Sequence, residues 1–370
     1  MVLDKDAIVP LMIDMCALLQ DRFAMLWRAF RIMQILAEEP QNRGIEFCAK
    51  FHPIKTGHAN FNPSGVFRAM WLAAKRRIRT ALQIPARFLI ARALVPALPL
   101  TMRKQIVVKA GSRGFFARSF LVAELLADLA RENPAGYHRF LWENHVGGPA
   151  HAKTYEISHR FGDENLRTSR RELLQFLRSC LIQRGTDPER DVRSVFDVGC
   201  SLGYVLRFVE KEIFPASTCL RGMDVDRYAI DTGNAYLRQS GSKIELVAGD
   251  VSELDQVMGK QTYDVVFCCG VLMYLNEDDA ARSIEAMLRH TRGLLGLITL
   301  ADPHVDNAQL NHSYVRSEDL GFVHNVDRMV AEAGGHVVFR KWTDPDEAGR
   351  YARNPPLFTL ARPGTKQVEP

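Results

Sequence analysis

Short apolar runs alternate with segments of helical spacing along the second half of the chain. The run at 195–198 is rich in β-branched and aromatic residues, and it ends in a turn that contains Gly199 and Gly203. Apolar residues at Val205 and Phe208 then follow the spacing of a helix. Apolar runs bounded by turn residues predict strands, and a period near 3.6 predicts helices. This stretch is therefore predicted to form a strand, a tight loop and a helix.

The same alternation continues toward the end of the chain. Strands and helices that alternate in this way predict an α/β fold with a parallel sheet. We expect five strand and helix units followed by a closing antiparallel pair. The further predicted strands cover residues 218–223, 244–248, 263–269, 293–300, 336–342 and 357–361, and the clearest helices cover 168–184, 227–239 and 325–333.

The glycine loop indicates a cofactor site. Ligands of parallel sheets bind beyond the carboxyl ends of the strands, and glycine lets the backbone approach them closely. A dinucleotide fingerprint needs glycines at the first, third and sixth positions, but counting from Gly199 the last two are Ser201 and Tyr204. The Gly-Lys-Ser/Thr ending of a P-loop does not follow either. A different nucleotide-like cofactor is predicted, with a simple strand-to-helix turn as the alternative.

The sequence Asp-Val-Gly-Cys-Ser-Leu-Gly at 197–203 resembles the first motif of class I S-adenosylmethionine (SAM) dependent methyltransferases. The resemblance implies that the glycine loop passes beside the amino acid part of SAM and that Asp197 helps to place it. The motif departs from the commonest form at Ser201, where a middle glycine is usual. Five motifs in the family's order extend the resemblance over about residues 150–363. They imply SAM as cofactor and a Rossmann-like sheet of seven strands with helices on both faces.

Carboxylates that follow the next two strands are predicted to bind the cofactor. A carboxylate at the end of the second strand can accept hydrogen bonds from both ribose hydroxyls; Asp224 is the predicted residue and Asp226 the alternative. The resemblance implies that Asp250 binds the adenine amino group and that Val251 packs on the ring, with a helix N-cap as the alternative for Asp250. The predicted cofactor residues are Asp197, Gly199, Cys200, Ser201, Gly203, Asp224, Val225, Asp250, Val251, Cys269 and Tyr155.

The chemistry asks little of the protein, because a sulfonium methyl group is already activated and transfer depends mainly on proximity and alignment. A base is needed only for a protonated nucleophile, and histidine has a suitable pKa. His312 and His304, in the loop after the fifth strand, are the candidate bases, with ordinary surface positions as the alternative. The resemblance implies that Cys269 and Tyr274 line the cofactor and the acceptor, with simple packing as the alternative. His312, His304 and Tyr274 form the predicted catalytic set.

Asp302, His304 and Asp306 alternate along the chain, as ligands of a divalent cation on a strand would. Pro303 argues against a regular strand at this point. Asp-Pro is also an ordinary turn initiator. No metal site is predicted. The segment before the first strand commonly folds over the cofactor in the family, which adds Tyr155 and His145 as contacts, with helix packing and capping as the alternative.

The 370 residues suit two domains, and 47% hydrophobic content suits a packed core. We predict a basic, mostly helical region at 1–135, a helical cap or linker at 136–190, the SAM-binding domain at 191–363 and a tail at 364–370. Seven cysteines without a C-x-x-C pair indicate neither a disulfide framework nor a thiolate zinc site. Charged residues and Pro10 interrupt any signal-peptide core near the N-terminus, so a cytoplasmic location is expected.

The two halves of the chain differ in charge. Residues 1–150 hold 21 Lys and Arg against 11 Asp and Glu, whereas residues 151–370 hold 27 against 32. A block such as Lys75, Arg76 and Arg77 attracts anionic surfaces. Peripheral contact with an anionic membrane is one interpretation, because the neighbouring segment 81–100 is almost wholly apolar; a buried helical hairpin is the preferred alternative. Nucleic-acid binding is disfavoured because no RNA-binding motif accompanies the charge, and no oligomeric state is predicted.

These observations predict a SAM-dependent methyltransferase that modifies an oxygen or nitrogen of a small-molecule or sugar-containing acceptor. A methyltransferase acting on a lipid or glycan at a membrane surface is one alternative. A SAM-binding scaffold without turnover is the other, because the sequence contains no decisive base.

Overall fold

The computed structural model describes residues 98–112, 125–145, 166, 168–302, 304–317, 319–343 and 355–364. Contacts divide the chain between residues 88 and 89, and all described residues lie in the second unit. The basic block at 75–77 and Tyr155 lie outside the described residues, as does most of the segment 81–100. The domain boundaries near residues 135 and 190 stay predictions. Within the described part of the chain, every helix is too short or too polar to cross a membrane.

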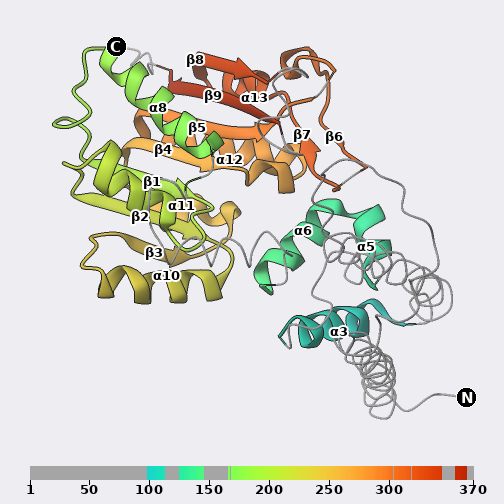
Figure 1. The fold of residues 1–370 in the computed structure, drawn as a ribbon. Coiled ribbons are helices and arrows are strands. Elements are labelled where there is room, and N and C mark those ends of the chain that lie inside the picture. The colour runs from blue at the N-terminus through green and yellow to red at the C-terminus, as the bar shows by residue number, and fades with distance from the viewer. Residues whose placement is uncertain are drawn as a thin grey trace, which may run out of the picture. The chain divides into compact units, whose positions relative to one another are not determined.

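Seven strands form one sheet in the order β3-β2-β1-β4-β5-β9-β8 (Figure 1). β1 to β5 run parallel, and β9 is antiparallel to both of its neighbours. The predicted Rossmann-like fold is confirmed, with strand ends displaced by at most two residues. The strands are β1 (Ser194–Val198), β2 (Cys219–Asp224), β3 (Glu245–Ala248), β4 (Tyr263–Cys269), β5 (Thr291–Leu300), β8 (Gly335–Trp342) and β9 (Pro356–Pro363).

The strand register gathers the carboxyl ends of β1 to β4 at one edge of the sheet. Val198 pairs with Met223 on one side and with Cys268 on the other, and Asp224 pairs with Ala248. The strand order reverses between β1 and β4, and such a reversal opens a crevice at the ends of the strands. The loops after these strands therefore meet in one place.

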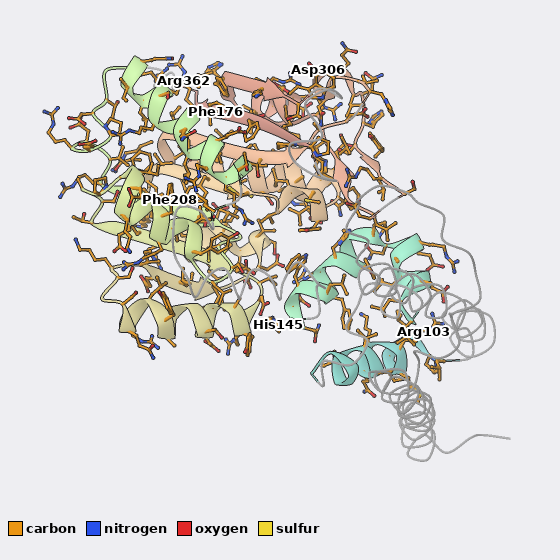
Figure 2. All side chains as sticks on the ribbon, in the orientation of Figure 1. Arg103, His145, Phe176, Phe208, Asp306 and Arg362 are labelled. Carbon is orange, nitrogen blue, oxygen red and sulfur yellow. The ribbon has the colours of Figure 1, made fainter. Side chains whose placement is uncertain are left out.

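Helices cover both faces of the sheet. Alternate residues of β1 face opposite sides: Val195 joins the core beneath α8, α9 and α10, whereas Phe196 and Val198 join the core beneath α11, α12 and α13. On α8, Phe176 lies against the rings of Phe339 and Phe358, with centroids 4.6 and 5.3 Å away (Figure 2). The helices are α8 (Thr168–Gln183), α9 (Tyr204–Phe208), α10 (Arg227–Gln239), α11 (Leu254–Met258), α12 (Glu277–Arg289) and α13 (Val326–Glu332).

Helix α12 has no explicit counterpart among the ranges predicted from the sequence. Its start is nevertheless encoded locally, because the Asn276 side chain accepts a hydrogen bond from the Asp279 backbone N–H at 2.8 Å. Three acidic residues occupy its first turn, where they suit the positive end of the helix dipole. Ala280, Ile284 and Met287 form its buried stripe.

Shorter elements complete the described part of the chain. The described helices before α8 are α3 (Leu100–Ser112), α5 (Ala127–Glu132) and α6 (Pro134–Glu143), and side chains from all three share a small core that includes Val107, Ala130 and Phe140. A two-stranded sheet joins β6 (Tyr314–Val315) to β7 (Phe322–Val323). The remaining single turns are η3 (Val209–Ile213), η4 (Val251–Glu253), η5 (Leu272–Tyr274) and η6 (Asn307–Gln309).

Candidate functional site

The glycine loop turns sharply between β1 and α9. Gly199 and Gly203 have φ angles of 82° and 77°, in the left-handed region that favours glycine. Ser201 stands where a middle glycine is usual in this motif. Its φ of 50° lies in the left-handed region, which glycine adopts more readily than serine. A Cβ atom on Gly199 would meet Val271 Cγ2 at 2.1 Å. The loop therefore packs closely against the segment that follows β4.

Asp224, at the end of β2, connects two neighbouring loops. Its Oδ2 accepts a hydrogen bond from the Ser201 backbone N–H at 2.8 Å, and its Oδ1 accepts one from the Asp226 N–H at 2.9 Å. Asp226 differs, because only 1% of its surface is exposed and its carboxylate caps α10 and accepts a hydrogen bond from His145 Nδ1 at 2.7 Å. The structure therefore brings Asp224 to the crevice and turns Asp226 away from it.

Asp197 lies beneath the glycine loop with 2% of its surface exposed. Its Oδ1 has no hydrogen-bond partner among the described residues. Burial raises the pKa of Asp197 well above its usual range; the positive charge of Arg170 opposes this shift, and the negative charge of Asp224 adds to it. A cationic group placed at this carboxylate would offset the cost of burying its charge.

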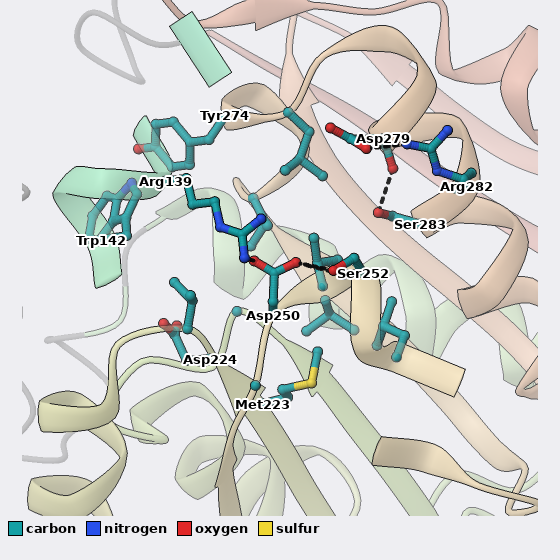
Figure 3. Close-up of a pocket in the computed structure, with 18 of the residues that line it drawn as sticks. Arg139, Trp142, Met223, Asp224, Asp250, Ser252, Tyr274, Asp279, Arg282 and Ser283 are labelled. Carbon is teal, nitrogen blue, oxygen red and sulfur yellow. Dashed lines mark hydrogen bonds and ion pairs between the residues drawn. The ribbon is translucent and has the colours of Figure 1, made fainter. Parts of the chain in front are cut away.

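Asp250 serves as the N-cap of η4, so the alternative role predicted for it is confirmed. Its Oδ1 accepts a hydrogen bond from the Ser252 N–H at 2.9 Å, and Glu253 Oε2 accepts one from the Asp250 N–H at 2.9 Å. The other carboxylate oxygen lies 3.3 Å from Arg139 Nη2 on α6 (Figure 3). Asp250 also faces the cavity, so the capping role and the predicted adenine contact are compatible.

A cavity of about 660 Å³ occupies the crevice and extends along α12. This size lies within the range of roughly 300–1,000 Å³ that is typical of small-molecule sites. Its lining carries both signs of charge, with arginines at 139, 170, 282 and 289 and carboxylates at 224, 250, 255, 279 and 285. The predicted site residues that line it are Gly199, Ser201, Asp224, Val225, Asp250, Val251, Cys269 and Tyr274.

Other predicted residues do not line this cavity. Asp197 and Gly203 lie under or behind the glycine loop, and the thiol of Cys200 is buried, which raises its pKa well above the usual value. A Cβ on Gly222 would meet Cys200 Cβ at 2.6 Å, so this side chain fills the core rather than the crevice. His304 and His312 are exposed on the loop beyond β5.

Aromatic side chains form a wall above the ends of β4 and β5. Tyr274, on η5, lies with its ring centroid 5.4 Å from that of Trp142 and 4.8 Å from that of His138, both on α6. Trp142 and Tyr274 both line the cavity (Figure 3). Nearby, burial raises the pKa of the Cys269 thiol well above its usual value, which disfavours a thiolate.

The sequence reading missed Arg139, Trp142 and Arg170 as cavity residues. A signal for α6 was nevertheless present in Asn133-Pro134, because the Asn133 side chain caps the helix and Pro134 occupies its first turn. Nothing in the local sequence indicates which face of α6 lines the cavity.

The acidic residues after β5 have structural partners. Asp302 accepts hydrogen bonds from the Tyr314 hydroxyl at 2.6 Å and the His304 N–H at 2.7 Å, and Asp306 is paired with Arg340. Burial by itself would raise the pKa of Asp302, but these hydrogen bonds outweigh it and lower the pKa below its usual value. Among the described residues, no three histidine, cysteine or acidic side chains are grouped as metal ligands.

Comparisons with known proteins agree with this arrangement. The family model described as a methyltransferase domain matches residues 195–293, from β1 into β5. No curated protein sequence matches the chain at a significant level.

Solved structures resemble parts of the chain at low identity. A SAM-dependent methyltransferase from Clostridium acetobutylicum is 12% identical, covers 58% of this chain and 100% of its own, and has a TM-score of 0.41. The mitomycin 7-O-methyltransferase is 14% identical with coverages of 74% and 71% and a TM-score of 0.40. The magnesium protoporphyrin IX methyltransferase from Synechocystis is 14% identical with coverages of 57% and 94% and a TM-score of 0.37. Similarities at this level carry no information on the substrate.

The domain-level match and the strand order confirm the family that the motifs at 197–203 and beyond indicate. Residues 195–293 therefore belong to the class I, Rossmann-like SAM-dependent methyltransferases, and SAM is the cofactor of this domain.

Proposed function

We propose that the chain transfers a methyl group from SAM to an oxygen or nitrogen of a small-molecule or sugar-containing acceptor. The observation that carries this proposal is the cavity at the carboxyl ends of β1 to β4. It has the size of a small-molecule site, and eight of the predicted site residues line it.

The residues beneath the glycine loop fit the amino acid part of SAM. Asp197 lies just beneath the cavity lining, and its buried Oδ1 accepts no hydrogen bond from the described residues, which suits an ammonium group. Arg170 lines the cavity and lies with its guanidinium 5.0 Å from the centroid of the Tyr204 ring. We assign the cofactor's ammonium to Asp197 and its carboxylate to Arg170, because each pairing joins opposite charges.

The loops after β2 and β3 fit the nucleoside part. Asp224 lines the cavity at the end of β2, and carboxylate oxygens are acceptors suited to the ribose hydroxyls. Val225 and Val251 supply apolar surface for the adenine ring, and Asp250 supplies an acceptor for its amino group. These roles depend on side chains at successive strand ends.

When bound, SAM supplies a methyl group activated by the sulfonium charge. The protein then has to hold the acceptor close and aligned and to exclude water. Of the predicted catalytic residues, Tyr274 lines the cavity, so we assign it and Trp142 to placing the acceptor. His304 and His312 are exposed and do not line the cavity, and we give them no role in proton transfer.

The charge of the cavity favours a small acceptor over a nucleic acid. Sites that follow a phosphate backbone carry an excess of lysine and arginine. Here four arginines face five carboxylates, so a polyanion would gain little.

The test combines binding and turnover. Calorimetry should show heat of association with SAM and with S-adenosylhomocysteine, and methyl-labelled SAM should label the small-metabolite fraction of a cell extract. Label confined to lipid would support the membrane-surface alternative, and binding without any labelled product would support the scaffold. Absence of binding by correctly folded protein would refute the proposal.

A further inference from the structure

Helix α6 forms a roof over the cavity with one face. Gly136, Arg139 and Trp142 line the cavity at intervals of three residues, which places these three on one side of α6, and the N-cap residue Asn133 also lines it. The Asn133 side chain accepts a hydrogen bond from the Gly136 N–H at 2.8 Å, so the start of the roof is capped. The roof is thus a defined helical surface rather than a loop.

The middle of α6 is held on the acceptor side. His138 Nε2 lies 2.9 Å from the carbonyl oxygen of Leu320, and its ring packs 4.8 Å from that of Tyr274. His138 is 5% exposed. Because an imidazole nitrogen that meets a carbonyl must carry the hydrogen, Nε2 is the donor in this contact.

The end of α6 is held on the cofactor side. His145, two residues beyond α6 (Figure 2), donates from Nδ1 to Asp226 Oδ2 at 2.7 Å, and its ring packs 4.4 Å from that of Tyr228. His145 has a φ of 54°, in the left-handed region that is unfavourable for a residue with a side chain. Such a conformation persists only where surrounding contacts fix it. The contact with Asp226 is such a constraint.

Asp226 passes this constraint to the cofactor loops. Its backbone N–H donates to Asp224 Oδ1 at 2.9 Å, and Asp224 Oδ2 accepts from the Ser201 N–H at 2.8 Å. One chain of hydrogen bonds therefore runs from His145 through the β2–α10 loop to the glycine loop. The second link between α6 and these loops is weaker, because Arg139 and Asp250 are 3.3 Å apart and the Arg139 side chain is 57% exposed.

We propose that His145 is a positioning residue for the cofactor: by holding Asp226 it fixes the orientation of Asp224 and couples the roof to cofactor affinity. This inference rests on the proposed function of the cavity. His138 anchors the same helix on the other side, against Leu320 and Tyr274 rather than against the glycine loop or the loops after β2 and β3. The two histidines therefore separate a specific effect on the cofactor from general loosening of α6.

The test measures binding of S-adenosylhomocysteine by calorimetry to the full chain and three variants. His145→Ala should weaken binding about tenfold, the usual scale for a lost hydrogen bond to a charged partner. His145→Asn should bind within about threefold of the wild type, because an amide N–H reaches Asp226 from nearly the place of Nδ1 and Asn tolerates a positive φ. His138→Ala should bind within about twofold.

An unchanged affinity in His145→Ala would overturn the inference, as would an equal loss in His138→Ala. A His145→Asn variant that loses as much as His145→Ala would also overturn it, since the hydrogen bond would then not be the cause. If the wild type itself gives no heat, the proposed function fails, and this inference fails with it.

Discussion

The floor and the roof of the cavity are built in different ways. The floor consists of loops that directly follow β1, β2 and β3, so each residue there is placed by the strand before it. The roof is α6, whose contacts reach far along the chain: His138 and Leu320 are 182 residues apart, and His145 and Asp226 are 81 apart. Local sequence determines the floor, whereas the roof depends on tertiary packing. Substitutions in the floor should therefore reduce SAM binding more than substitutions in the roof.

Gly199→Ala should have the largest effect on stability and SAM binding, because both the backbone conformation and the packing at this position of the floor require glycine. A Cβ there would lie 2.1 Å from Val271 Cγ2, at a φ of 82°. We expect the free energy of unfolding to fall by about 3 kcal/mol and SAM binding to be lost. Gly241→Ala is the control: its φ is 66° but nothing lies within 4 Å, so chemical denaturation should show a loss of only about 1 kcal/mol. Similar losses in both variants would remove the packing argument.

Asp224→Ala should weaken SAM binding by about ten- to a hundredfold, equivalent to roughly 1–3 kcal/mol for a lost charged hydrogen-bond partner. The change also frees the Ser201 and Asp226 N–H groups, which adds to the loss. Asp231→Ala, an exposed position on α10, serves as the control and should leave the dissociation constant unchanged. Calorimetry of both variants decides whether the end of β2 belongs to the floor.

Asp197→Asn should alter the pH dependence of stability. Burial raises the pKa of Asp197 above its value of about 3.9 in the unfolded chain. Between these two values the native state binds more protons than the unfolded state, so the wild type loses stability as pH rises through that window and then levels off.

The Asn variant lacks this loss, so its free energy of unfolding should rise relative to that of the wild type as pH increases above about 4. Urea titrations at a series of pH values would measure it. A difference that is constant with pH would show that Asp197 is not the titrating group. SAM binding should become weaker in the same variant, since the ammonium loses its charged acceptor.

Trp142→Ala tests the roof. We expect the acceptor KM to rise about tenfold through lost aromatic contact, while the dissociation constant of SAM stays within about twofold. Steady-state kinetics with methyl-labelled SAM measures the acceptor KM, and calorimetry measures the dissociation constant of SAM. If SAM affinity fell instead, the division between floor and roof would not hold at this residue.

Ser201→Gly should have the smallest effect. Glycine relieves the positive φ of Ser201 but gains freedom in the unfolded chain, and the two effects nearly cancel. We expect a change in the free energy of unfolding within about 1 kcal/mol and little change in SAM affinity, because the Ser201 N–H that binds Asp224 is kept. A large loss would show that the hydroxyl has a role of its own.

The sequence predicted where the floor lies for a physical reason. Strands with buried faces appear as apolar runs, and the residue after each run is placed by that strand. Asp224 is predicted from its position and Asp250 from the family resemblance, and both line the cavity. The same reasoning could not separate Asp224 from Asp226, because only the helix cap and His145 show that Asp226 is turned away. It also found Cys200 in the motif but could not see that its side chain fills the space above Gly222.

The roof is less accessible to prediction from the sequence. His304 and His312 are predicted bases because their loop follows a strand; the structure places both at exposed positions outside the cavity lining, and their role stays a prediction. Trp142 and Arg139 were not identified as cavity residues, although they lie on one face of α6. The apolar face of a helix can be predicted from its sequence. The surface against which that face packs cannot, because it depends on distant contacts such as that of His138 with Leu320.

The recognised family segment begins inside β1 and stops inside β5, so it ends before β8 and β9 and starts after α6 and α8. A fragment trimmed to those limits would keep the family motifs. It would lose α6, which covers the cavity, and the strands β8 and β9 at one edge of the sheet. The segment that carries the family match and the segment that forms the cavity are therefore different lengths of polypeptide. Recombinant fragments should begin upstream of Asn133 and continue through Pro363.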